Sequence, residues 1–349
     1  MKTTNVSTLS IINATKETRV SLQAKLVEAQ KESSTGRHAD VTLTLGYLTQ
    51  RTVSLRQDHA RLQTFKDTNI VAASRLELTQ TTLDGVADAA QSFLTTLMAA
   101  RAAPSSAGVA ITDAKNKLTS FEAAMNTTVN GTHIFAGVNT DVKPVTAYFG
   151  DPPSAAETAV ADAFSTAFGV SQGEPGVANI TGADMETFLD GAFSDLFNAA
   201  NWSTSWSSAS DQNITSRIST NERIETSTNA NAAPFRAIAS AYTMIADLDI
   251  ENLSPDAYLA VIDKAIKVVG QVTADLTDLR AGLGTAQERI KAADDRADVQ
   301  MSLLTDHIGE LERVDGYEAT ARVNALLTQI ETAYALTARL QNLTLLDHI

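Results

Sequence analysis

Two glycines one residue apart, in the stretch LRAGLGTAQERI from Leu279 to Ile290, have the composition of a loop that cradles a phosphate. Such a loop normally follows a buried strand, and its Walker form also needs a lysine. Neither is found here, and the apolar spacing continues through Gly282 and Gly284 with Leu283 at the apolar position. We therefore expect a helix, at a cost of roughly 1 kcal/mol per interior glycine. The expected compensation is close approach of a neighbouring helix or an assembly partner.

Side chains that bind metals or act in catalysis form no recognisable pattern. The histidines lack a second ligand at metal-site spacing, apart from carboxylates such as Asp306. Their positions are His38, His59, His133, His307 and His348. Asp294, Asp295 and Asp298 lie near Arg296 and lack the glycine turn of a calcium loop. The GxSxG and HExxH patterns are missing. The sequence thus predicts no enzyme, no cofactor and no metal site.

The cysteine and tryptophan content further limits the kinds of functional site that the chain can contain. The chain has no cysteine, which excludes disulfides, Cys-ligated zinc and a thiol nucleophile. Trp202 and Trp206 would share a helix face, and an exposed pair could bind sugars. A buried pair in the core of the middle segment is the interpretation that we favour.

Charge is concentrated in the middle of the chain. The net charge is −14, and residues 141–254 hold fifteen Asp/Glu against four Lys/Arg. A basic surface for nucleic acid is therefore not expected. No apolar run approaches the ~20 residues of a membrane helix, so we expect no membrane partner. The start of the chain lacks the apolar core and cleavage site of a secretory signal, so we expect any export to be signal-independent.

Apolar residues repeat every seven positions over two long stretches, a pattern typical of helices that pack along a seam. Pro104 is expected to end the first helix, and a shorter helix with Ile111 and Met125 on one face follows it. Ser254 and Pro255 are expected to open the second long helix, whose register breaks near Gly316. The predicted core seam consists of Leu48, Leu55, Leu62, Leu76, Leu83, Ile262, Val269, Leu276, Leu283 and Ile290.

The two chain ends are also expected to be helical, but they have too little apolar surface to be stable alone. We expect them to pair with each other and with other copies. The predicted assembly interface consists of Leu9, Ile12, Leu22, Leu26, Val323, Leu326, Ile330, Tyr334, Leu340 and Leu343. Between the ends, residues 141–254 hold five of the seven prolines and short β-like runs, which indicates a small mixed domain.

The predicted fold is mainly α: a long antiparallel helical bundle or coiled coil formed by both chain ends, with an inserted small α+β domain. Five parts are expected. They are an N-terminal assembly helix (1–45), a helical hairpin of the core bundle (46–140), an acidic outer domain (141–254), a core bundle helix (255–304) and a C-terminal assembly helix (305–349).

Several stretches resemble the bacterial flagellin superfamily. SSTGR, residues 33–37, looks like its Ser-Ser-Gly-basic turn, and LGTAQERI resembles its Leu-Gly-Ala-x-Gln-x-Arg signature. VDGYEATARVNALLTQIETAYALTARLQNLTLLDHI, residues 314–349, looks like its final helix. Within the superfamily, NGTHIFAGVNTDVKP, residues 130–144, is similar to the junction members that join hook to filament. The turn departs from the pattern by reading Ser-Thr-Gly, and HADVTLTLG after it is unusually apolar.

The resemblance implies a structural adapter of the flagellum. Implied partners are other copies in a ring, an adjacent hook-associated protein, flagellin, and an export chaperone before secretion. The implied location is the extracellular flagellum, reached without a cleavable signal peptide. The main alternative is flagellin itself, the filament subunit. A hydrolase within residues 141–254 and a cytoplasmic coiled-coil scaffold are further alternatives.

Overall fold

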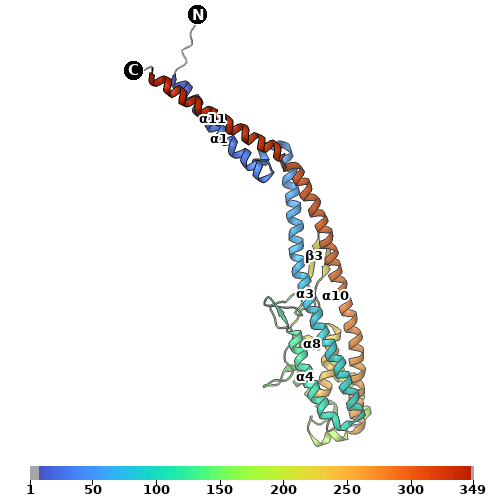
Figure 1. Cartoon of the computed structure of the whole chain (residues 1–349). Helices are drawn as coiled ribbons and strands as arrows, with labels where there is room; N and C mark the ends of the chain where they lie inside the picture. The colour runs from blue at the N-terminus through green and yellow to red at the C-terminus, as the bar shows by residue number, and fades with distance from the viewer. Residues whose placement is uncertain (1–7, 347–349) are drawn as a thin grey trace. The chain divides into compact units, whose positions relative to one another are not determined.

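Figure 1 shows a computed structural model of the chain, which describes the backbone of residues 8–346 and the side chains of residue 10 and residues 13–339. The chain forms two compact units. Unit 1 comprises residues 1–63 and 296–349, and unit 2 comprises residues 64–295. The fold is mainly α, with long helices from both chain ends and a small strand-containing insert, as predicted. The division into five functional parts stays a prediction. None of the described helices is long and apolar enough to cross a membrane.

Unit 1 is built on an antiparallel pair of terminal helices, which lie side by side in Figure 1. Ser33 hydrogen-bonds Thr320, and Gln23 donates to Tyr334, so residue numbers rise along one helix as they fall along the other. The elements are α1 (Thr8–Thr35), α2 (Val41–Leu45), η1 (Gly46–Leu48), the start of α3 (Thr49–Ala102), the end of α10 (Pro255–Glu312) and α11 (Gly316–Leu346). The break before Gly316 lies where the heptad register predicted it.

Unit 2 packs the rest of α3 and α10 with α4 (Ala107–Met125) and α9 (Ala233–Asp247) around an aliphatic and aromatic core. Pro104 follows the end of α3 and opens η2 (Pro104–Ser106), as predicted. Ser254 Oγ accepts the amide of Ala257 at 3.2 Å, and Pro255 is the first residue of α10, so the predicted helix start is confirmed.

The insert adds short helices and one antiparallel hairpin to unit 2. Its helical elements are α5 (Ala155–Phe168), η3 (Pro175–Asn179), α6 (Gly182–Phe188), η4 (Leu189–Phe193), α7 (Ser194–Leu196) and α8 (Ala199–Ser205). Its strands are β3 (Thr215–Ser219) and β4 (Glu222–Glu225), and a second short hairpin, β1 (Thr128–Val129) with β2 (Thr132–His133), precedes the insert. The Trp202 and Trp206 rings stack at 5.0 Å and are buried, which excludes an exposed sugar-binding pair.

Candidate assembly surface of the terminal helices

The contact between α1 and α11 buries part of the predicted assembly interface within one chain. Leu326 and Ile330 are each 8% exposed, and Leu22, Leu26 and Val323 are half-buried. Tyr334 is 49% exposed; its hydroxyl accepts a hydrogen bond from Gln23 and its ring lies under the Arg19 guanidinium. The side chains of Leu9, Ile12, Leu340 and Leu343 lie outside the described residues. The structure therefore brings together the described members, and their role in assembly stays a prediction.

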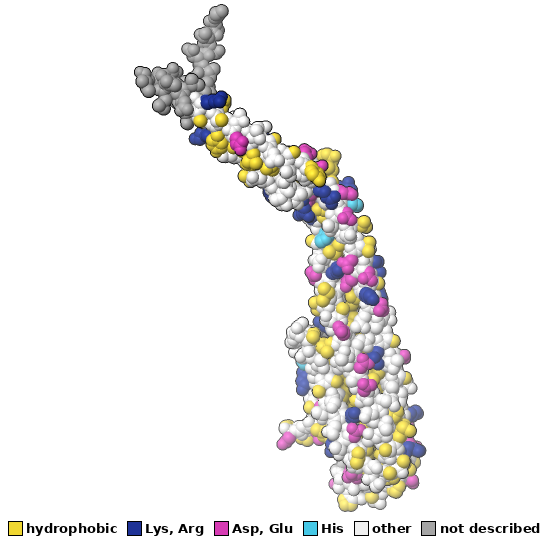
Figure 2. Space-filling view, viewed as in Figure 1, with side chains coloured by type: hydrophobic (Ala, Val, Ile, Leu, Met, Phe, Trp, Pro, Cys, Tyr) yellow, Lys and Arg dark blue, Asp and Glu magenta, His cyan; other side chains and the backbone are white. Residues whose placement is uncertain are grey.

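Large apolar side chains remain exposed along this helix pair, as the yellow atoms over the terminal helices in Figure 2 illustrate. Val20 and Val27 of α1 are 59% and 65% exposed, and Leu327 and Leu336 of α11 are 41% and 52% exposed. Exposed apolar residues are ordinary one at a time, whereas a series of them marks an interaction surface. The intrachain pairing of α1 and α11 thus leaves apolar surface available to another subunit.

A buried carboxylate fixes the turn between the terminal helices and the long ones. Glu312, the last residue of α10, has no exposed surface. Arg56 binds it through Nε at 3.0 Å and through Nη2 at 2.8 and 2.6 Å to its two oxygens, and Arg37 Nη1 lies 3.8 Å away. The His38 amide donates to the Glu312 carbonyl at 3.0 Å. A buried carboxylate requires such partners, because an unpaired one costs several kcal/mol.

A second buried carboxylate, Glu32, holds the same turn from the α1 side. Its Oε2 accepts from Arg322 Nη1 of α11 at 3.0 Å, and its Oε1 accepts from the Ala39 amide at 3.2 Å. His38 Nδ1 lies 3.7 Å from that Oε1. Neither glutamate was predicted as a functional residue. In the heptad pattern both look like ordinary polar residues of a helix. Only the turn signature SSTGR indicated that this turn matters.

The predicted core seam lies mostly in the interior. The seven seam residues of unit 2, namely Leu76, Leu83, Ile262, Val269, Leu276, Leu283 and Ile290, are buried, whereas Leu48, Leu55 and Leu62 of unit 1 are half-buried. In unit 2, α3 and α10 run antiparallel. Gln80 donates to the Arg280 carbonyl at 2.8 Å, and Asp84 pairs with Arg280. The Tyr258 hydroxyl donates to the Ala100 carbonyl at 2.9 Å.

The glycine pair that suggested a phosphate loop lies in the middle of α10. A Cβ on Gly282 would meet no described atom within 4 Å, and one on Gly284 would meet only the Gln80 side chain at 3.8 Å. The helix confirms the sequence-based interpretation. No described helix approaches closely enough to require glycine, so that part of the expectation is wrong. The other expected compensation, an assembly partner, stays a prediction.

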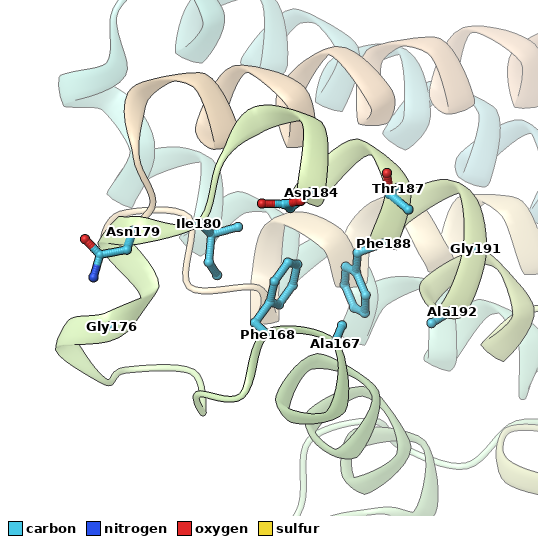
Figure 3. Close-up of a pocket in the computed structure, with 10 residues that line it drawn as sticks. All are labelled: Ala167, Phe168, Gly176, Asn179, Ile180, Asp184, Thr187, Phe188, Gly191 and Ala192. Carbon is cyan, nitrogen blue, oxygen red and sulfur yellow. The ribbon is translucent and has the colours of Figure 1, made fainter.

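The insert contains a cavity of about 640 Å³, and Figure 3 shows its lining. Phe168 and Phe188 pack at 5.1 Å along one side of it. The single carboxylate in the lining, Asp184, already accepts a hydrogen bond from the Thr181 hydroxyl at 2.7 Å. Among the residues that the structure describes, no group of three or more histidines and carboxylates could hold a metal; His348 lies outside them. The cavity offers no acid–base pair.

Comparisons with known proteins agree with this architecture. Residues 6–140 match the bacterial flagellin N-terminal helical region, and residues 266–349 match the bacterial flagellin C-terminal helical region. These regions account for more than half of the chain, which belongs to the flagellin superfamily. The family associates with the flagellum and has a structural role there.

One solved structure shares the fold over most of its length. It is that of a protein from Vibrio parahaemolyticus provisionally named as a flagellar hook-associated protein, with a TM-score of 0.52 and 10% sequence identity. The match covers 76% of this chain and 97% of that one. Among proteins with curated functions, none matches this chain.

Proposed function

We propose that this chain is hook-associated protein 3, the structural adapter between hook and filament, and that it is not an enzyme. The observation that carries the proposal is the segment Asn130–Pro144, which resembles the corresponding segment of that protein. The fold shared with the Vibrio parahaemolyticus protein that is provisionally named as a flagellar hook-associated protein supports it.

The same segment has a defined structural role, because it joins the insert to the helices of unit 2. The Ala230 amide donates to the Phe135 carbonyl at 2.8 Å, and the Ser210 amide donates to the Ala136 carbonyl at 3.0 Å. Phe135 is fully buried. Gly137 has a φ of +64°, and a Cβ there would approach the Gln212 carbonyl to 2.7 Å. The distinguishing motif is therefore constrained by packing with the insert, which we propose faces outward.

In the proposed mechanism the chain is exported through the flagellar channel without a cleavable signal and assembles as a ring. The ring lies between an adjacent hook-associated protein and the first turn of flagellin. A chaperone holds the terminal helices before export. The apolar side chains exposed on α1 and α11 then become buried between neighbouring copies, which stabilises the assembled state over the monomer.

Immunogold electron microscopy of intact motile cells tests this proposal, with an antibody against residues 141–254 and an antibody against flagellin as the matched control. We expect one gold cluster where filament meets hook, while the control labels the whole filament. Label along the filament would identify the chain as flagellin, the second candidate, which shares the terminal helical regions. Label confined to the cell body would contradict both and favour a cytoplasmic scaffold.

A further inference from the structure

The segment between α1 and α3 presents two apolar side chains to solvent. Leu43 and Tyr47, which we call the knob, are 85% and 90% exposed. Only Tyr317, at 92%, is more exposed among the large apolar side chains described. Exposed tyrosine and leucine at one place are unfavourable in a monomer, and tyrosine is typical of interface hot spots.

The backbone that carries the knob is held in one conformation. Asp40 caps α2 by accepting the Leu43 amide at 2.9 Å, and the Thr49 hydroxyl donates to the Thr42 carbonyl at 3.2 Å. Gly46 has a φ of +51°, which a residue with a side chain rarely adopts. A fixed loop with exposed apolar side chains is preorganised for binding, since little conformational entropy is lost on docking.

Unit 2 contains an apolar groove of about 320 Å³. Its walls are mostly small or apolar residues of α3 and α4, and Tyr242 of α9 also lines it. The groove is lined by Thr81, Thr82, Gly85, Val86, Ala89, Lys117, Ser120, Phe121, Ala124 and Tyr242. This volume lies at the lower end of ligand-sized pockets, about 300–1,000 Å³, and has room for large side chains of a partner.

Lys117 gives the groove a positive charge. Its side chain is half-buried and forms no ion pair among the described residues. A partner that places a carboxylate there is electrostatically complementary to the groove. The knob supplies such a carboxylate, because Asp40 is exposed three residues before Leu43.

We infer that the knob of one copy inserts into the groove of a second copy of this chain, with Asp40 facing Lys117. The inference rests on the self-association in the proposed function. A knob and a groove at different places on one chain form a heterologous contact, which generates rings or helical arrays rather than closed dimers. Flagellin-family assembly requires such a contact, and this pair of surfaces supplies it.

Single-cysteine chains test the contact, since the natural chain has no cysteine. Differently tagged Tyr47→Cys and Ser120→Cys chains are expressed together in cells, and isolated flagella are oxidised. A mixed-tag disulfide then forms only between copies. We expect at least tenfold more mixed-tag disulfide from this pair than from a control pair in which Ala274→Cys, on the exposed face of α10, replaces Ser120→Cys. Equal yields, or no mixed-tag product, would overturn the inference.

Filling the groove is an independent test. Gly85→Leu adds a side chain where a Cβ meets no atom within 4 Å, and Gly270→Leu does the same on α10 as the control. We expect Gly85→Leu and Leu43→Asp each to reduce incorporation into flagella about tenfold while keeping wild-type helicity. The control Gly270→Leu should incorporate like the wild type. Incorporation of Gly85→Leu equal to that of Gly270→Leu would contradict the docking.

The two proposals fail separately. A disulfide together with gold along the whole filament would support the knob contact and refute the junction role. Gold at the junction alone, without the disulfide, would support the junction role and refute the knob contact.

Discussion

Arg56 and Glu312 are 256 positions apart in the sequence, yet the Arg56 guanidinium binds both oxygens of a Glu312 carboxylate that has no exposed surface. Glu312 ends α10, and its carbonyl accepts the His38 amide. This pair therefore connects the start of α3, the turn after α1 and the end of α10 within unit 1.

Replacing Arg56 with methionine is expected to loosen that turn. Removing one member of a buried ion pair costs about 3 kcal/mol, and a smaller loss is expected here because Arg37, 3.8 Å from Glu312, remains as a second partner. Trypsin cleavage after Arg37 should become roughly ten to a hundred times faster, since cleavage follows the population of the opened state. Arg61→Met is the control, because Arg61 forms an exposed ion pair with Asp58 and should change the rate little. Equal rates for both variants would contradict a structural role for the buried pair.

Replacing Leu326 and Ile330 together with aspartate should block incorporation into flagella. Both are 8% exposed in the α1–α11 contact, and burying a carboxylate there without a partner is strongly unfavourable. Unit 2 contains neither residue, so its thermal transition, followed by circular dichroism, should stay within a few degrees of the wild-type value. Gln329→Asp, at an exposed position on the same helix, should incorporate normally. Normal incorporation of the double variant would remove the C-terminal seam from the mechanism.

Stability is expected to depend on pH through Asp247 in unit 2. Burial raises the pKa of this carboxyl from 3.8 to about 6, helped by Glu157 and opposed by the Tyr148 hydroxyl and Lys115. At a pH between these two values, Asp247 holds a proton in the folded chain and has lost it in the unfolded chain. The contribution of Asp247 is therefore fully present below about pH 4 and is lost as pH rises through 6, by at most about 3 kcal/mol.

Asp247→Asn should remove that slope and raise the free energy of unfolding at pH 7.5, because its amide oxygen can still accept the Tyr148 hydroxyl. Urea unfolding at pH 4.5, 6 and 7.5 measures the difference between the two chains. Tyr148→Phe is the matched control, since losing the hydrogen bond should raise the pKa of Asp247 further and keep the slope. Parallel curves for wild type and Asp247→Asn would contradict the assignment.

Gly137→Ala should destabilise unit 2 by more than the usual strain of an alanine at positive φ, about 1–2 kcal/mol. The added Cβ would also collide with the carbonyls of Ser210 and Gln212. Gly131 has a φ of +78° and open space around it, so Gly131→Ala measures the strain alone. The difference between the free energies of unfolding of these two variants measures the cost of the collision. Equal losses of stability would show that the insert moves enough to accommodate the added Cβ.

The heptad spacing, Pro104 and Pro255 were enough to predict the long helices, because periodicity and proline act locally along the chain. The seam residues from Leu76 to Leu83 and from Ile262 to Ile290 are buried for the same reason. Local stretches such as SSTGR and LGTAQERI also carried the family resemblance. Even the glycine pair at Gly282 and Gly284 was placed correctly in a helix.

Only the tertiary structure decided which polar residues became structural. Glu32, Glu312 and Asp247 resemble any other acidic residue in the sequence. Glu32 and Glu312 are buried and Asp247 is half-buried, beside partners that lie far away along the chain. The groove beside Gly85 and the exposed knob at Tyr47 are likewise properties of packing. The sequence by itself determined the helices and the family. Long-range packing, which no local pattern encodes, determined which charges are buried and which apolar surfaces are left for a neighbour.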